Sequence, residues 1–158
     1  MRSILIVLSV ALISCSSKPE ASPESTEKPT VSSTNDQKAY LEKAAAEPGA
    51  QKTASGLVYR DVTAGSGASP KATDTVKVHY RGTLINGKEF DSSYGQAPAE
   101  FPLNRVIACW TEGVQKMKVG GKARLVCPAS IAYGDASPTP DIPNGATLVF
   151  EIELLGIS

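Results

Sequence analysis

Two segments of the chain alternate between apolar and polar side chains, and this pattern constrains the fold more than any other feature. The alternation runs through residues 75–84 and returns in residues 147–155. Successive side chains of an extended strand point to opposite faces, so a period of two predicts β-strands with one buried face. Asn86-Gly87 follows the first segment and favours a two-residue hairpin turn in which both residues have positive φ angles. We therefore expect an antiparallel sheet.

One helix is expected within this sheet protein. Three shorter strands are also predicted, at residues 57–62 and 88–90 before the helix and at residues 122–127 after it. Trp110, Val114 and Met117 then recur at i, i+4 and i+7, which predicts a helix that begins near Trp110 and ends at Gly120-Gly121. These elements predict an α+β domain over residues 55–158, with a twisted antiparallel sheet wrapped around one short helix.

The first fourteen residues have the pattern of an export signal. Arg2 precedes an apolar run, Ile4–Ile13, that is shorter than the ~20 residues of a membrane-spanning helix and has the length of a signal-peptide core. The end of this run and the two residues after it, Leu-Ile-Ser-Cys at 12–15, resemble a bacterial lipobox. In that case residues 1–14 are removed and Cys15 is acylated as the mature N-terminus. An ordinary signal peptide with a chance cysteine is the alternative.

Residues 15–36 are expected to form a disordered tether that starts at Cys15. They are rich in Ser, Thr, Pro, Glu and Lys, and Val31 is their only aliphatic residue larger than alanine. Such a segment buries too little apolar surface to offset the entropy of ordering. Residues 37–54 are predicted to hold a short helix and a connection to the domain. Asn35 or Asp36 is the expected N-cap, and Pro48-Gly49 ends the helix.

Charge and motif content argue against several classes of function. The 16 Lys and Arg residues balance the 16 Asp and Glu residues, so no excess of positive charge is present to recruit nucleic acid. The sequence contains no C-x-x-C, no H-E-x-x-H and no P-loop lysine. His79, the only histidine, lies on the polar face of a predicted strand, which favours a solvated residue. We expect no metal, no cofactor and no covalent nucleophile.

Aromatic residues are the candidates for a binding function. Five of them lie on separate predicted elements: Tyr80, Phe90, Trp110, Tyr133 and Phe150. They could converge on a concave apolar pocket that includes a few polar groups. They could equally form the core of a small sheet, and the pattern alone favours the core.

A series of motifs in the same order resembles the FKBP-type peptidyl-prolyl cis-trans isomerases. The motifs are VHYRG at 78–82, NGKEFDSS at 86–93, VI at 106–107, CWTEGV at 109–114, MKVGGKA at 117–123, IAYG at 131–134 and ATLVFEIELL at 146–155. PAEFPL at 98–103 and AYLEK at 39–43 are similar to the bacterial periplasmic branch that includes macrophage infectivity potentiators. The resemblance implies an FKBP-like fold for residues 55–158.

The resemblance also implies a role for individual residues. Trp110 would form the floor of a substrate pocket. The Tyr133 hydroxyl and the backbone N–H of Ile107 would each bind a substrate carbonyl, and Asp91 would be the pocket carboxylate. The walls would be formed by Tyr80, Phe90, Val106, Ile107 and Phe150. The rim would include Ala132 and Ile142.

The chain departs from the family pattern at two loops and one cysteine. The family commonly carries an arginine in the loop after Asp91, whereas residues 92–100 contain none. Residues 135–143 are rich in proline where the family is richer in glycine. Cys109 replaces a usual glycine. In an exported protein Cys109 and Cys127 favour a disulfide, with two buried free thiols as the alternative.

The resemblance therefore implies an isomerase that accelerates rotation about Xaa–Pro bonds in exported proteins by non-covalent binding. Its partners would be proline-containing unfolded or partly folded polypeptides, and macrolide inhibitors are candidate ligands. A low-turnover holdase or adaptor on the same scaffold is the alternative, because the 135–143 loop is altered and Asp91 lacks the usual arginine. The export signal predicts a location in the cell envelope, anchored by lipid to the outer membrane of a Gram-negative bacterium and facing the periplasm. A monomer is expected, because the long helical dimerisation segment of the related branch is reduced here to one short helix.

Overall fold

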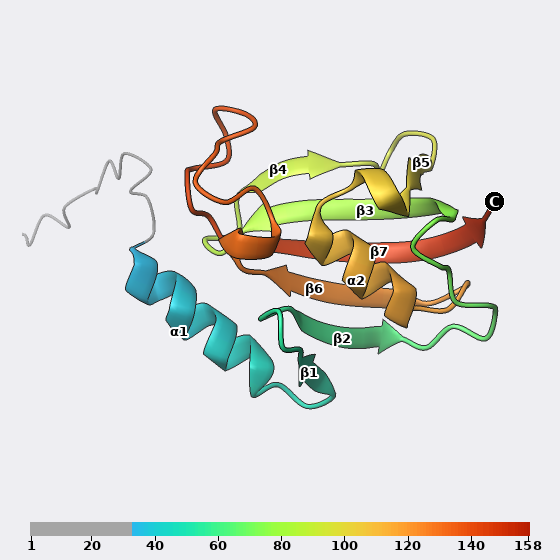
Figure 1. Cartoon of the computed structure of the whole chain (residues 1–158), viewed down its shortest axis with the longest axis horizontal. Helices are drawn as coiled ribbons and strands as arrows, with labels where there is room; N and C mark the ends of the chain where they lie inside the picture. The colour runs from blue at the N-terminus through green and yellow to red at the C-terminus, as the bar shows by residue number, and fades with distance from the viewer. Residues whose placement is uncertain (1–32) are drawn as a thin grey trace, which may run out of the picture. The chain divides into compact units, whose positions relative to one another are not determined.

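A single antiparallel sheet organises residues 33–158, the part of the chain that the computed structural model describes (Figure 1). Its strands follow the order β1-β2-β6-β7-β3-β4, and β5 also pairs with β3. The strands are β1 (Ala50–Lys52), β2 (Val58–Thr63), β3 (Thr75–Leu84), β4 (Glu89–Ser92), β5 (Ala99–Pro102), β6 (Lys122–Cys127) and β7 (Leu148–Ile157). The helices are α1 (Thr34–Ala45) and α2 (Ala108–Lys116), with 3₁₀ turns η1 (Leu103–Arg105) and η2 (Ala129–Ile131).

The predicted α+β class with an antiparallel sheet is confirmed, and two strands were missed. β1 lies before residue 55, so the sheet begins ahead of the predicted domain boundary. It is three residues long and has no apolar alternation. β5 ends on Pro102 and follows Pro98, which lowers its strand propensity. Both strands form because a neighbouring strand supplies the hydrogen bonds, which a local pattern cannot show.

The core lies between the sheet and α2, which crosses the sheet in front of β6 and β7 (Figure 1). Val76, Val78, Leu125 and Ile152 point to this side and are fully buried. α2 approaches closely at Gly113, where a Cβ atom would collide with the Leu125 side chain. A fully buried apolar side chain contributes about 1.5–3 kcal/mol, so this layer supplies much of the stability.

The bounds of α2 and of the hairpin differ from the predictions. α2 ends at Lys116 rather than at Gly120-Gly121, because the backbone of Met117 is already extended. The hairpin loop has three residues instead of two. The Leu84 N–H donates to the Lys88 carbonyl at 2.8 Å, and the Gly87 N–H donates to the Leu84 carbonyl at 2.9 Å. Gly87 adopts a φ of 86°, as a type I turn closed by a left-handed residue requires.

Helix α1 covers part of the opposite face of the sheet. Ala44 packs with Val58, Val126 and Val149, which alternate along their strands with residues of the main core. The N-cap is Ser33, not Asn35 or Asp36. Asp36 instead completes a capping box, since its backbone N–H donates to the Ser33 hydroxyl and its carboxylate accepts from the Ser33 N–H. The Ser-x-x-Asp spacing at residues 33–36 was the sequence signal that could have predicted this cap.

Polar contacts hold α1 and the segment that follows it on the sheet. The Glu47 carboxylate accepts from Arg60 at 2.5 Å and from Arg124 at 3.3 Å. Arg124 also donates to the Tyr40 hydroxyl at 2.7 Å, and the Thr147 N–H donates to the Gln37 side chain at 2.6 Å. The helix is thereby fixed at several points along its length.

The predicted signal peptide, Cys15 and the tether up to residue 32 lie outside the described residues. The helix begins at Thr34, so its first three residues lie in the segment predicted as tether. Within residues 33–158, no helix is long and apolar enough to cross a membrane.

A disulfide joins Cys109 in the first turn of α2 to Cys127 at the end of β6, so the pair that the sequence left open is bridged. Their Cα atoms are 5.8 Å apart, and both residues are fully buried. The bridge ties the end of the helix that carries Trp110 to the centre of the sheet.

Replacing both Cys109 and Cys127 by Ala should lower the free energy of unfolding by about 3 kcal/mol. The bridge links residues 18 apart in sequence, and in the chain-entropy model a loop of that size contributes ~3 kcal/mol. Urea unfolding of the oxidised protein and of the double variant measures the difference. Wild type unfolded with reductant present should match the double variant. A loss below ~1 kcal/mol would contradict this chain-entropy account.

Candidate active site

A cavity of about 310 Å³ opens beside the N-terminal end of α2. Its lining comes from β3, β4, β5, β7, α2, the turn before α2 and the segment after η2. The lining residues are Tyr80, Phe90, Asp91, Phe101, Arg105, Val106, Ile107, Trp110, Tyr133 and Phe150. The structure therefore brings together all of the pocket residues that the family resemblance implied and adds Phe101 and Arg105.

Trp110 forms the centre of an aromatic cluster. Its ring centroid lies 5.3 Å from that of Tyr80, 5.5 Å from Phe101 and 5.4 Å from Phe150, each in an edge-to-face arrangement. Edge-to-face pairs at this spacing are favourable beyond their buried area. Only 5% of Trp110 is exposed, so the indole is held in place as an apolar floor.

Strand register explains why these rings converge. Tyr80 on β3 lies opposite Ile152 on β7, and Gly82 lies opposite Phe150, so Tyr80 and Phe150 point to the same face. Gly82 is also required for space. A Cβ atom there would lie 2.6 Å from Phe90 and 3.0 Å from Phe150, whose rings are 5.7 Å apart. Gly82 is thus a site residue that sequence reasoning missed.

Asp91 is held by Tyr80. The Tyr80 hydroxyl donates to the Asp91 carboxylate at 2.6 Å. Residues 92–100 contain no arginine, so this hydrogen bond is one contact that supports Asp91 in its place. Burial first, and then the hydrogen bond to Asp91 and its negative charge, raise the pKa of Tyr80 well above its ordinary value.

Two residues that line the cavity each carry a hydrogen-bond donor that pairs with no described residue. In the described part of the chain, neither the Tyr133 hydroxyl nor the Ile107 N–H has a hydrogen-bond partner. Burial, followed by the negative charge of Asp91, raises the pKa of Tyr133. The hydroxyl therefore stays protonated and remains a donor. Ile107 is the N-cap of α2, and its carbonyl accepts from Trp110 at 2.9 Å, which fixes its peptide group.

The two residues implied for the rim do not line the cavity. Ile142 is 4% exposed and belongs to the main core, and Ala132 packs against that core. Ile142 points inward because its loop folds back on itself, with the Ser137 hydroxyl donating to the Ile142 carbonyl. Lys88 and Asp141, 2.8 Å apart, join this loop to the β3–β4 hairpin.

The two added residues were hard to find from sequence. Phe101 lies in a strand flanked by prolines, and Arg105 ends a 3₁₀ turn that has no sequence signature. His79 lies on the opposite face of β3, half-buried, with its Nδ1 3.1 Å from the Ser93 hydroxyl and its ring stacked on Tyr94. Among the described residues, no group of His, Cys, Asp and Glu is arranged to hold a metal ion.

The fold and the cavity define an α+β domain that has an aromatic pocket on one face of its sheet. The family model for FKBP-type peptidyl-prolyl cis-trans isomerase matches residues 67–155. The chain belongs to this family.

Curated relatives carry the same domain within longer chains. The FKBP-type peptidyl-prolyl cis-trans isomerase FkpA of Escherichia coli strain K12 is 52% identical over 121 residues, which are 76% of this chain and 44% of that protein. The FkpA of Aeromonas hydrophila is 52% identical over 119 residues, again 44% of its length. The chain thus spans less than half the length of these relatives.

Solved structures agree with the family assignment. The crystal structure of Escherichia coli FkpA matches with a TM-score of 0.75 and 51% identity, covering 78% of this chain and 58% of that one. A peptidyl-prolyl cis-trans isomerase from Pseudomonas syringae pv. tomato also matches with a TM-score of 0.75. It is 38% identical, and the match covers 84% of this chain and 98% of that one.

Stability should fall above pH 10 in a manner that depends partly on Tyr80. The folded-state pKa of Tyr80 lies above its ordinary value of 10.0, so the stabilisation is present below pH ~10 and is lost as pH rises through the folded pKa. Tyr80→Phe should therefore weaken the decline of unfolding free energy as pH rises above about 10. The variant should still show part of the decline in unfolding free energy, because the pKa of Tyr59 is also raised. Identical pH profiles for wild type and variant would refute this assignment.

Proposed function

We propose that the domain catalyses cis-trans isomerisation of Xaa–Pro bonds in unfolded or partly folded polypeptides. The observation that carries the proposal is the Trp110 floor together with two donors, the Tyr133 hydroxyl and the Ile107 N–H, on residues that line the same cavity. Family membership supports the same activity. No covalent step is required, which agrees with a cavity lined by no serine, cysteine or histidine.

The barrier to be lowered is electronic. Resonance gives the peptide C–N bond partial double-bond character, and rotation about it costs ~18–20 kcal/mol. The planar amide is more charge-separated than the twisted amide. Transfer from water to an aromatic cavity therefore disfavours the planar ground state relative to the twisted transition state. Each ~1.4 kcal/mol removed from the barrier speeds rotation tenfold.

The fixed donors hold the flanking peptide while the bond turns. The Ile107 N–H and the Tyr133 hydroxyl can each bind a carbonyl of the substrate chain. Because Ile107 is fixed by α2 and the Tyr133 pKa is raised, both groups are donors before substrate arrives. Preorganised donors cost no reorganisation during the reaction. Asp91 contributes by accepting the hydrogen bond from the Tyr80 hydroxyl, which orients the Tyr80 ring.

We further propose that the enzyme acts on exported proteins from a lipid anchor at Cys15. The apolar segment before Cys15 and the polar segment after it support this placement in the cell envelope, with the domain facing the periplasm from the outer membrane. Macrolide inhibitors are expected to compete for the cavity. The short α1 supports a monomer.

The decisive experiment is a peptide assay with the domain. Cis-to-trans relaxation of a short Xaa–Pro peptide should accelerate at micromolar protein, and a macrolide inhibitor should suppress the acceleration. Binding of the peptide without acceleration would replace the enzyme by a holdase or adaptor.

Tyr133→Phe should lower the catalysed rate about two- to ten-fold, because one hydrogen bond to the substrate contributes ~0.5–1.5 kcal/mol. The melting temperature should not change, since the hydroxyl has no partner within the described residues. Tyr94→Phe is the matched control, because Tyr94 is exposed and stacks on His79 away from the cavity. Equal rates for Tyr133→Phe and wild type would show that the carbonyl is bound elsewhere.

A further inference from the structure

The cavity carries one positive charge that no described residue neutralises. Asp91 and Arg105 are its only charged lining residues. The Asp91 carboxylate receives the Tyr80 hydroxyl, whereas no carboxylate in residues 33–158 lies within 4.0 Å of the Arg105 guanidinium. Arg105 is exposed to solvent at the cavity, so its charge is open to a ligand.

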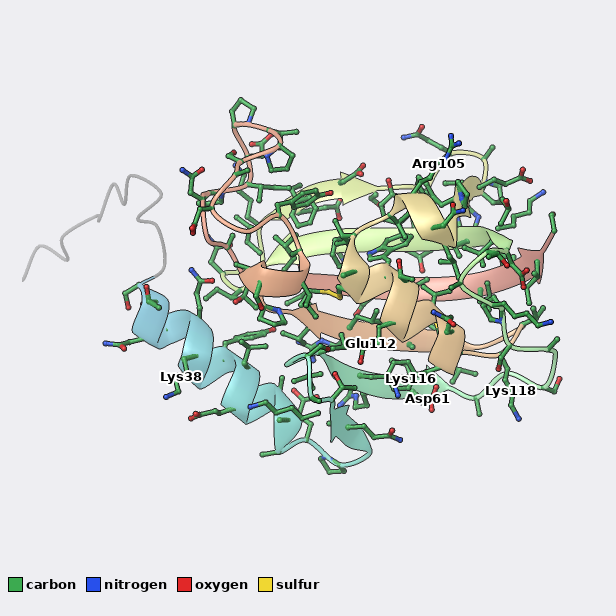
Figure 2. All side chains as sticks on the ribbon, viewed as in Figure 1. Lys38, Asp61, Arg105, Glu112, Lys116 and Lys118 are labelled. Atoms are coloured by element: carbon green, nitrogen blue, oxygen red, sulfur yellow. A yellow bond between two sulfur atoms is a disulfide. The ribbon has the colours of Figure 1, made fainter. Side chains whose placement is uncertain are left out.

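The backbone that presents Arg105 is fixed. Arg105 ends the η1 turn, whose first residue, Leu103, is fully buried (Figure 2). The Leu103 N–H donates to the Asp74 carbonyl at 3.0 Å, and the Thr111 hydroxyl donates to the Leu103 carbonyl at 2.6 Å. These bonds tie the turn to β3 and α2. The charge is therefore held near the cavity rather than carried on a mobile loop.

Arg105 also stands next to the groups that would bind the peptide backbone. It directly precedes Val106, and Ile107, the N–H donor, follows two positions later. A peptide whose carbonyl accepts from Ile107 would place a neighbouring side chain within reach of a long arginine. A guanidinium stays protonated at every physiological pH and binds carboxylates through a planar set of donors. Carboxylate side chains are thus the chemical class that this position favours.

We propose that Arg105 makes the enzyme prefer substrates with an acidic residue directly before or after the proline. The proposal rests on the proposed isomerase function and adds a substrate class to it. An exposed ion pair of this kind changes affinity by a factor of about 1.5 to 5. Glu should therefore be favoured over Gln by about three-fold, and Lys should be the least favoured.

The test uses two peptide series, one with Glu, Gln or Lys before the proline and one with the same residues after it. Each peptide is assayed for relaxation rate and titrated by fluorescence of Trp110, the only tryptophan. Wild type, Arg105→Gln and Arg105→Glu are compared at low and high salt. Lys38→Gln is the matched control, because it removes one positive charge from exposed Lys38 on α1 (Figure 2).

Wild type should favour Glu in at least one series, and salt should reduce the preference. Arg105→Gln should abolish the preference, Arg105→Glu should reverse it, and Lys38→Gln should keep it. Equal treatment of Glu, Gln and Lys in both series, or a preference that survives Arg105→Gln, would overturn the proposal. Failure of the isomerase function is separate: no peptide would be accelerated, while the fluorescence titration would still show whether Arg105 selects Glu.

Discussion

The seating of Trp110 among rings from three strands is the contact on which the rest of the structure depends. Tyr80, Phe101 and Phe150 surround the indole at 5.3–5.5 Å, edge to face. The same packing that docks α2 on the sheet therefore also makes the cavity floor. Because Cys109 precedes Trp110 and is bridged to Cys127, the helix cannot slide along the sheet without straining a covalent bond. The packing around Trp110 that stabilises the core therefore also sets the shape of the site.

The cavity lies at the edge of the core, where aromatic side chains line a space that the domain itself does not fill. In the proposed mechanism, the apolar rings supply the surface that disfavours a charge-separated amide, and two donors without a partner among the described residues would bind the substrate. Asp91 lies beside both parts, since it accepts a hydrogen bond from Tyr80 and its charge adds to the burial that raises the pKa of Tyr133. Arg105 adds a charge at the same cavity. In the proposed function the floor would accept any prolyl bond, and groups around it would discriminate among substrates.

Helix α1 has a different relation to the domain. It packs through Ala44 against Val149 on the face of the sheet away from Trp110, and Glu47 binds arginines from two strands. The match spans less than half the length of the FkpA relatives from Escherichia coli and Aeromonas hydrophila, and in this chain one short helix covers part of that face. No residue of α1 lines the cavity.

The sequence by itself determined the alternating strands, the α2 stripe and the family, because burial of one face leaves a period in the chain and a functional pocket preserves residue types in order. It also indicated the aromatic residues but could not tell core from pocket. Tertiary structure decided that question, along with β1, β5, the bridge between Cys109 and Cys127, the inward turn of Ile142 and the presence of Arg105 at the cavity. Each depends on contacts between distant segments, and the distance between two segments is not encoded in the local pattern of either.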